Sequence, residues 1–182
     1  QAAPLVSSLL QFARGVPAKQ RTRADVRDAL GLSGELTTLL PMADAARLRT
    51  QIDQLGVRRI VIRPVPHRMK YDRTVIAVQA GKPIEIVFDN VDIMPHNLLF
   101  TRPGGMLSVA QAAERMATLP DAFARHFVPE SDQVVAATRL LQARQSQRLV
   151  FDVPGQTGEY PFVCTFPNHW RTMNGVMHVV DD

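Results

Sequence analysis

The stretch that decides the fold lies near the C-terminus and reads Cys164-Thr165-Phe166-Pro167-Asn168-His169-Trp170-Arg171-Thr172-Met173. Upstream of it the chain carries Met94-Pro95-His96-Asn97. A thiolate, two imidazoles and a thioether are the donors of a trigonal copper site with a weak axial methionine. The two segments therefore predict a site for one copper ion, with four candidate ligands: His96, Cys164, His169 and Met173.

The strand that leads into this loop explains why the cysteine faces inward. Alternate residues of a strand share one face, so we expect the side chains of three residues to face the core: Tyr160, Phe162 and Cys164. Pro167 and Asn168 then predict a turn, because proline fixes its φ angle and asparagine tolerates unusual backbone angles. The turn returns His169 toward the sulfur. A single short loop cannot form a rigid cage, so we expect His96 to anchor the site from a neighbouring strand.

The ligand loop and the Pro95-His96-Asn97 segment together resemble those of cupredoxins, and in particular those of azurins and auracyanins. The resemblance runs from Val57 to Asp182, about two thirds of the chain. It implies a mainly β protein, a Greek-key β-sandwich that holds a type 1 (blue) copper and transfers one electron without enzymatic turnover. Carried over to this chain, it makes His96, Cys164 and His169 equatorial ligands and Met173 the axial ligand.

The resemblance also implies a set of supporting contacts. Asn97 would tie its strand to the ligand loop through Thr165, and the backbone N–H groups of Asn97 and Phe166 would donate to the sulfur. Pro95 stands before the first histidine, as in plastocyanins, where azurins carry a glycine that brings a fifth contact to the metal. In the family the imidazole edge of the residue matching His169 is the port for electrons.

Trp170 and Arg171 follow that port directly in the sequence. They are either ordinary packing residues of the loop or a docking patch, in which the indole gives apolar area and the guanidinium gives a preference for the sign of charge. We expect the partners to be redox proteins such as a cytochrome or an oxidoreductase. The net charge of +4 weakly favours acidic ones.

Composition excludes several other classes of protein. The 182 residues contain no long run of like charge, and aromatic residues make up 6%, so nucleic-acid binding is not expected. No stretch approaches eighteen apolar residues, so we expect no transmembrane segment in the chain as given. The single cysteine excludes an internal disulfide and does not identify the compartment. The resemblance implies the periplasm or another extracytoplasmic space.

The chain is predicted to have two parts. Residues 1–56 form an N-terminal helical extension or linker arm, through which the protein could also oligomerise, and residues 57–182 form the cupredoxin domain. Helical spacing within the arm marks three segments, which begin near Leu5, at Ala24 and at Met42. Alternating apolar residues predict strands at 60–62, 75–80, 84–88 and 149–153.

A helical insertion is predicted at about 103–147. Within it, Ser108 could open a capping box with Gln111, and Ser131 could precede a second helix. We expect the insertion to cover one side of the sandwich and to screen the site.

The sequence is also compatible with three other functions. The chain could be the C-terminal cupredoxin domain of a larger multidomain oxidoreductase, or a copper storage or delivery protein. A Cys164/His169 pair could also act as nucleophile and base of a hydrolase, but Met173 has no role in that scheme.

Overall fold

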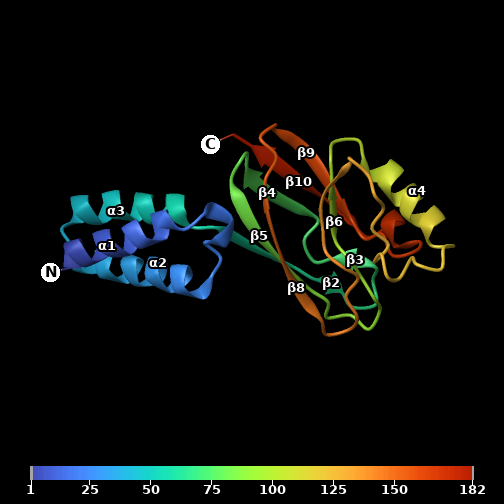
Figure 1. The fold of residues 1–182 in the computed structure, drawn as a ribbon, viewed down its shortest axis with the longest axis horizontal. Helices are drawn as coiled ribbons and strands as arrows, with labels where there is room; N and C mark the ends of the chain where they lie inside the picture. Colours follow the sequence, from blue (N-terminus) through green and yellow to red (C-terminus); the bar gives the residue numbers. More distant parts are fainter. Residues whose placement is uncertain (1, 182) are drawn as a thin grey trace. The chain divides into compact units, whose positions relative to one another are not determined.

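The computed structural model describes residues 2–181 and divides the chain into two compact units, Gln1–Arg58 and Arg59–Asp182. The first unit is helical and the second is built on β-sheets, as Figure 1 shows. The outermost positions of the two predicted parts, Gln1 and Asp182, lie outside the described residues.

The N-terminal unit contains three α-helices and two short 3-10 helices: α1 Ala2–Gly15, η1 Ala18–Gln20, α2 Ala24–Leu36, η2 Thr37–Leu39 and α3 Met42–Leu55. Their apolar faces pack into a core of their own, formed by Val6, Leu10, Ala13, Val26, Leu30, Leu48 and Leu55. Leu5, near which the first helical segment is predicted to begin, lies on the exposed side of α1 together with Phe12. The three expected helical segments are therefore present.

The second unit is a β-sandwich of two main sheets, so the predicted fold class is confirmed. One sheet has the order β1-β5-β8 and contains β1 Arg58–Ile62, β5 Pro83–Asp89 and β8 Ser146–Asp152. The other has the order β4-β10-β9-β6-β7 and contains β4 Val75–Gln79, β10 Asn174–Val180, β9 Gly158–Val163, β6 Leu99–Thr101 and β7 Val134–Ala137. A small hairpin pairs β2 Pro64–Val65 with β3 Lys70–Tyr71.

Period-two alternation fills the space between the sheets. Ile84, Ile86 and Phe88 of β5 are fully buried and share one core with Phe162 of β9 and Met177 of β10. β10 pairs in parallel with β4 and antiparallel with β9, which places Met177 opposite Tyr160. Each fully buried aromatic or aliphatic side chain stabilises the fold by about 1.5–3 kcal/mol relative to exposure. This core holds the strands that carry the site.

The predicted insertion is only partly helical. It contains one helix, α4 Met106–Met116, which begins before Ser108, so the predicted capping box is wrong. The Ser108 hydroxyl instead donates to the Gly105 carbonyl. The second predicted helix is also wrong, because Val134–Ala137 forms strand β7 and pairs antiparallel with β6. The unpaired edge of β6 offers these residues a ladder of backbone partners that local helical spacing does not reveal.

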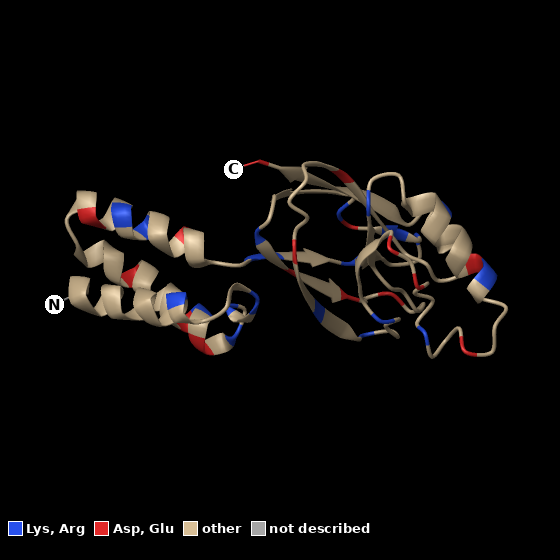
Figure 2. Ribbon diagram, turned by 45° about the horizontal axis from the view of Figure 1, so that its top comes forward, with Lys and Arg blue, Asp and Glu red and all other residues tan. Residues whose placement is uncertain are grey.

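Charged side chains of both signs are scattered over the strands and helices of both units (Figure 2). Among residues 2–181, no helix is both long enough and apolar enough to cross a membrane.

Candidate metal centre

The ligand loop begins where β9 ends and folds back on itself within a few residues. Asn168 has a φ angle of 67°, in the left-handed region that asparagine tolerates, and the His169 N–H donates to the Phe166 carbonyl. The Met173 N–H donates to the His169 carbonyl, and the Cys164 N–H donates to the Met173 carbonyl. These bonds place Met173 beside Cys164 at the start of β10.

His96 reaches the loop from a segment that precedes β6. Its backbone forms an isolated antiparallel bridge with Leu141, with hydrogen bonds of 3.1 and 2.8 Å in the two directions. The Asn90 side chain donates to the Leu141 carbonyl at 2.9 Å and to the Met94 carbonyl at 2.8 Å. The anchor is thus fixed by long-range contacts.

Three of the predicted ligands converge on one point. Cys164 Sγ lies 3.9 Å from His96 Nδ1 and 3.6 Å from His169 Nδ1, and the two nitrogens lie 3.2 Å apart. A trigonal ion with bonds of about 2.0 Å to nitrogen and about 2.3 Å to sulfur would separate these atoms by about 3.5–3.7 Å. The spacing therefore fits one small ion between them.

The surroundings fit a soft metal ion. Cys164, His96 and Met173 are fully buried, and His169 is 3% exposed. Met173 and Cys164 belong to the same apolar core cluster. Thiolate and thioether donors select copper over harder ions, and a buried thioether beside a His₂Cys set is typical of the axial position.

Burial also sets the protonation of the ligand side chains in the metal-free protein. Desolvation raises the pKa of Cys164 to about 12. Hydrogen bonds from the backbone N–H groups of Asn97 and Phe166 to the sulfur partly oppose this increase. Desolvation and the neighbouring His96 lower the pKa of His169 to about 4, and desolvation lowers the pKa of His96. Thus the imidazoles are neutral at ordinary pH, and binding of a cation would release the thiol proton.

Asn97 links the two ligand segments. Its side-chain amide donates to Thr165 Oγ1 at 2.8 Å, and its carbonyl oxygen accepts from the Thr165 N–H at 2.8 Å. The Asn97 backbone carbonyl accepts from the Tyr71 hydroxyl at 2.7 Å. The geometry therefore brings together the residues for which supporting contacts are predicted, and it adds Tyr71.

The segment that follows α4 closes over the loop. The His126 carbonyl accepts from Asn97 at 2.8 Å, and the Phe127 carbonyl accepts from the Thr165 hydroxyl at 2.7 Å. The rings of Phe127 and Phe166 lie 5.3 Å apart, and those of Phe166 and His169 lie 5.0 Å apart. Through these backbone carbonyls the insertion thus supports the two residues that link the ligand segments, a role that its sequence does not signal.

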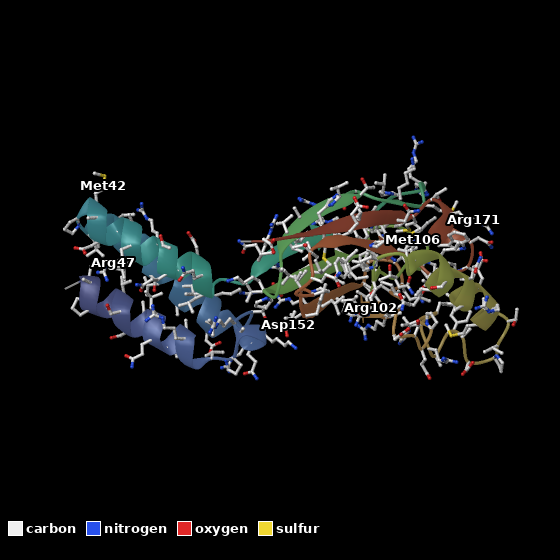
Figure 3. All side chains as sticks on the ribbon, turned by 90° about the horizontal axis from the view of Figure 1, so that it is seen from above. Met42, Arg47, Arg102, Met106, Asp152 and Arg171 are labelled. Atoms are coloured by element: carbon white, nitrogen blue, oxygen red, sulfur yellow. The ribbon has the colours of Figure 1, made fainter. Side chains whose placement is uncertain are left out.

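Trp170 and Arg171 lie against α4. The Trp170 indole N–H donates to Glu114 at 2.6 Å, and Arg171 lies 3.6 Å from the same carboxylate and stacks over the indole at 4.6 Å. Figure 3, in which Arg171 is labelled, shows it beside this helix. Trp170 is half-buried, whereas 61% of the Arg171 side chain is exposed.

The sequence profile of the copper-binding proteins of the plastocyanin/azurin family matches residues 63–180, which include all four ligands. The chain belongs to this family. It is a cupredoxin with a type 1 copper site formed by His96, Cys164, His169 and Met173, and it acts in electron transfer rather than as an enzyme.

Individual relatives agree with this assignment. Auracyanin-A from Chloroflexus aurantiacus is 27% identical over 113 residues, which is 61% of this chain and 67% of the relative. Outer membrane protein H.8 from Neisseria meningitidis is 42% identical over 55 residues, 29% of this chain and 30% of the relative. The crystal structure of reduced auracyanin from Roseiflexus castenholzii has a TM-score of 0.60 at 28% identity, and the match covers 69% of this cupredoxin and 99% of that chain.

One buried residue beside the ligands escapes sequence reasoning. Asp92 is 2% exposed, and its carboxylate lies 3.1 Å from Nε2 of His96. Burial tends to raise its pKa, but hydrogen bonds from His96, Ile93 and His67 outweigh this and lower it. The only local signal is an acidic residue four positions before a ligand histidine.

Proposed function

We propose that this cupredoxin carries single electrons between redox proteins, such as a cytochrome and an oxidoreductase, in the periplasm or another extracytoplasmic space. Bound copper supplies a reversible one-electron change. The observation that carries the proposal is the burial of the ligand set between two hydrogen-bonded segments. In such a site little has to move when the charge of the ion changes.

The protein residues keep the site fixed and dry. Asn97 and Thr165 hold the histidine segment and the cysteine loop in register through two mutual hydrogen bonds. Bonds from backbone N–H groups to Cys164 Sγ orient the thiolate, and the packing of Met173 in the apolar core excludes water. We assign Asn97, Thr165, Phe166 and Pro95 this supporting role.

We propose that electrons enter and leave near His169 by way of Phe166. The imidazole itself is almost fully covered, but its ring contacts Phe166, which is half-buried. Phe166 in turn contacts Phe123, at a centroid distance of 6.5 Å, and Phe123 is 64% exposed. A partner that docks over this end of the sandwich would therefore approach the site through aromatic contacts.

Trp170 and Arg171 are proposed to contribute to docking in different ways. The indole is fixed by Glu114 and supports the loop, whereas the guanidinium is exposed and can select the sign of a partner's charge. Replacing Arg171 by glutamate should slow electron exchange with an acidic partner and weaken its dependence on salt. Equal rates of electron exchange for the wild type and for Arg171→Glu would show that Arg171 is not part of the docking surface.

The location outside the cytoplasm is supported by relatives rather than by this chain's own geometry. The Neisseria relatives are named outer membrane proteins.

The separate helical core of the N-terminal unit favours one alternative. A compact helical unit that precedes the cupredoxin along the chain is compatible with a C-terminal domain of a larger oxidoreductase. This alternative changes the partner and not the copper chemistry. Storage or delivery of copper is disfavoured, because a fully buried ligand set retains its ion.

The visible spectrum of the Cu(II)-loaded protein tests the proposed function. An intense thiolate-to-copper band is expected, and Cys164→Ser should abolish it while leaving the far-ultraviolet signature of a β protein. A colourless Cu(II) protein, or a band that survives in Cys164→Ser, would contradict the assignment of the thiolate.

A further inference from the structure

A buried carboxylate lies on the side of the His96 ring that faces away from the other ligands. His96 presents Nδ1 to Cys164 and His169, and its Nε2 lies 3.1 Å from Oδ2 of Asp92. The side chains of both residues are at most 1% exposed. Water therefore screens this contact very little.

The loop holds the Asp92 carboxylate in one orientation. Its other oxygen, Oδ1, accepts the Ile93 N–H at 2.7 Å and lies 3.4 Å from the His67 N–H. Its own N–H donates to Oδ1 of Asn90 at 3.1 Å. Because Oδ1 is occupied by backbone donors, Oδ2 is the oxygen that faces His96.

We propose that Asp92 is a positioning residue that fixes the tautomer of His96 and lowers the reduction potential of the copper. An ionised carboxylate can only accept a hydrogen bond, so it requires the imidazole proton on Nε2. Nδ1 then keeps its lone pair for the metal. The negative charge, relayed through the ring, makes the imidazole a stronger donor and stabilises the higher oxidation state.

The contact differs from a purely structural bond in its effect on the metal. An aspartate that only shaped the loop would act through Oδ1 and the Ile93 N–H, and its replacement by asparagine would preserve that bond. Loss of a carboxylate partner from a ligand histidine, in contrast, typically costs about 10- to 100-fold in metal affinity.

Asp92→Asn separates the two roles. With Oδ1 still facing the backbone donors, the amide NH₂ faces Nε2 and can only donate to it, which drives the proton to Nδ1 and blocks the ligand nitrogen. We expect Cu(II) affinity to fall about 10- to 100-fold. If the loss falls mainly on Cu(II), the potential of the remaining copper rises by about 60–120 mV, since a tenfold change is 59 mV for one electron.

Asp89→Asn is the matched control. Asp89 lies in the same region, its side chain is 31% exposed and it pairs with Arg63 at 3.0 Å. This variant should leave both the copper affinity and the potential unchanged. Equal potentials and affinities for wild type and Asp92→Asn, or equal shifts in the two variants, would overturn the proposal.

A measurement on the unaltered protein avoids any folding defect of the variant. Nitrogen-15 NMR of the metal-free chain reports the tautomer of His96, and we expect the proton on Nε2. A proton on Nδ1 would overturn the proposal even if the variants cannot be prepared.

Discussion

Removal of the Asn97 side chain should destabilise the copper-binding unit more than any single surface change. Asn97 is fully buried and makes three side-chain hydrogen bonds of 2.8 Å, two with Thr165 and one with the His126 carbonyl. In Asn97→Ala the buried Thr165 N–H loses its partner, which costs about 1–3 kcal/mol, and the two other lost bonds cost about 1 kcal/mol each. The sum is about 3–5 kcal/mol, a large part of the 5–15 kcal/mol that typically stabilises a domain.

Guanidinium chloride unfolding of the metal-free protein measures this loss. Trp170 is the single tryptophan of the chain, so its fluorescence follows the unit that contains the site. Asn174→Ala is the control, because Asn174 is half-buried and donates one side-chain bond, to the Trp170 carbonyl at 2.9 Å. It should cost about 1 kcal/mol. A loss in Asn97→Ala no larger than that of the control would refute the idea that this residue ties the segments together.

Three further predictions concern the ligands and the arm. Met173→Gln should lower the reduction potential, because the soft thioether favours Cu(I) more than a harder oxygen donor does, and Met173→Leu should raise it, because loss of the donor leaves the more positive Cu(II) less stabilised. If voltammetry showed that both substitutions shift the potential in the same direction, Met173 would be excluded as the axial ligand. Metal-free protein should lose stability as the pH falls from about 6.5 to about 4, because the unfolded chain protonates His169 before the folded chain does; the loss is at most about 3 kcal/mol, and His169→Asn should show a shallower slope. Deletion of residues 1–56 should leave copper binding unchanged, as measured by titration, since no ligand lies in this segment. Loss of copper binding in the truncated protein would show that the domain boundary lies elsewhere.

The ligands could be predicted from the sequence because their signal is local. Three of them lie within one loop, and the residue types, their order and the left-handed Asn168 are all encoded within ten positions. Several strands of the sandwich, among them β5 and β9, could be predicted equally well, since alternation of apolar residues follows directly from which face each side chain occupies. The sheets confirm both patterns.

The elements that escaped prediction depend on contacts between distant residues. Val134–Ala137 has spacing that suits a helix as well as a strand, and the choice is made by the edge of β6, more than thirty residues earlier. Asp92 has no motif, because its role arises only when the loop turns its carboxylate toward His96. Side-chain contacts of this kind are set by packing and not by local propensity.

The insertion takes part in the hydrogen-bond network around the metal centre. His126 and Phe127 both have a φ angle of 56°, a left-handed conformation that costs about 1–2 kcal/mol for each ordinary residue. This conformation turns their carbonyls toward Asn97 and Thr165, whose hydrogen bonds offset the cost. His126 and Phe127 thus connect the insertion to the histidine segment and to the cysteine loop, respectively. A movement of the insertion would therefore disturb the bonds that hold Cys164 and His96 in register, and a partner that docks on its exposed Phe123 would contact an element already coupled to the copper ligands.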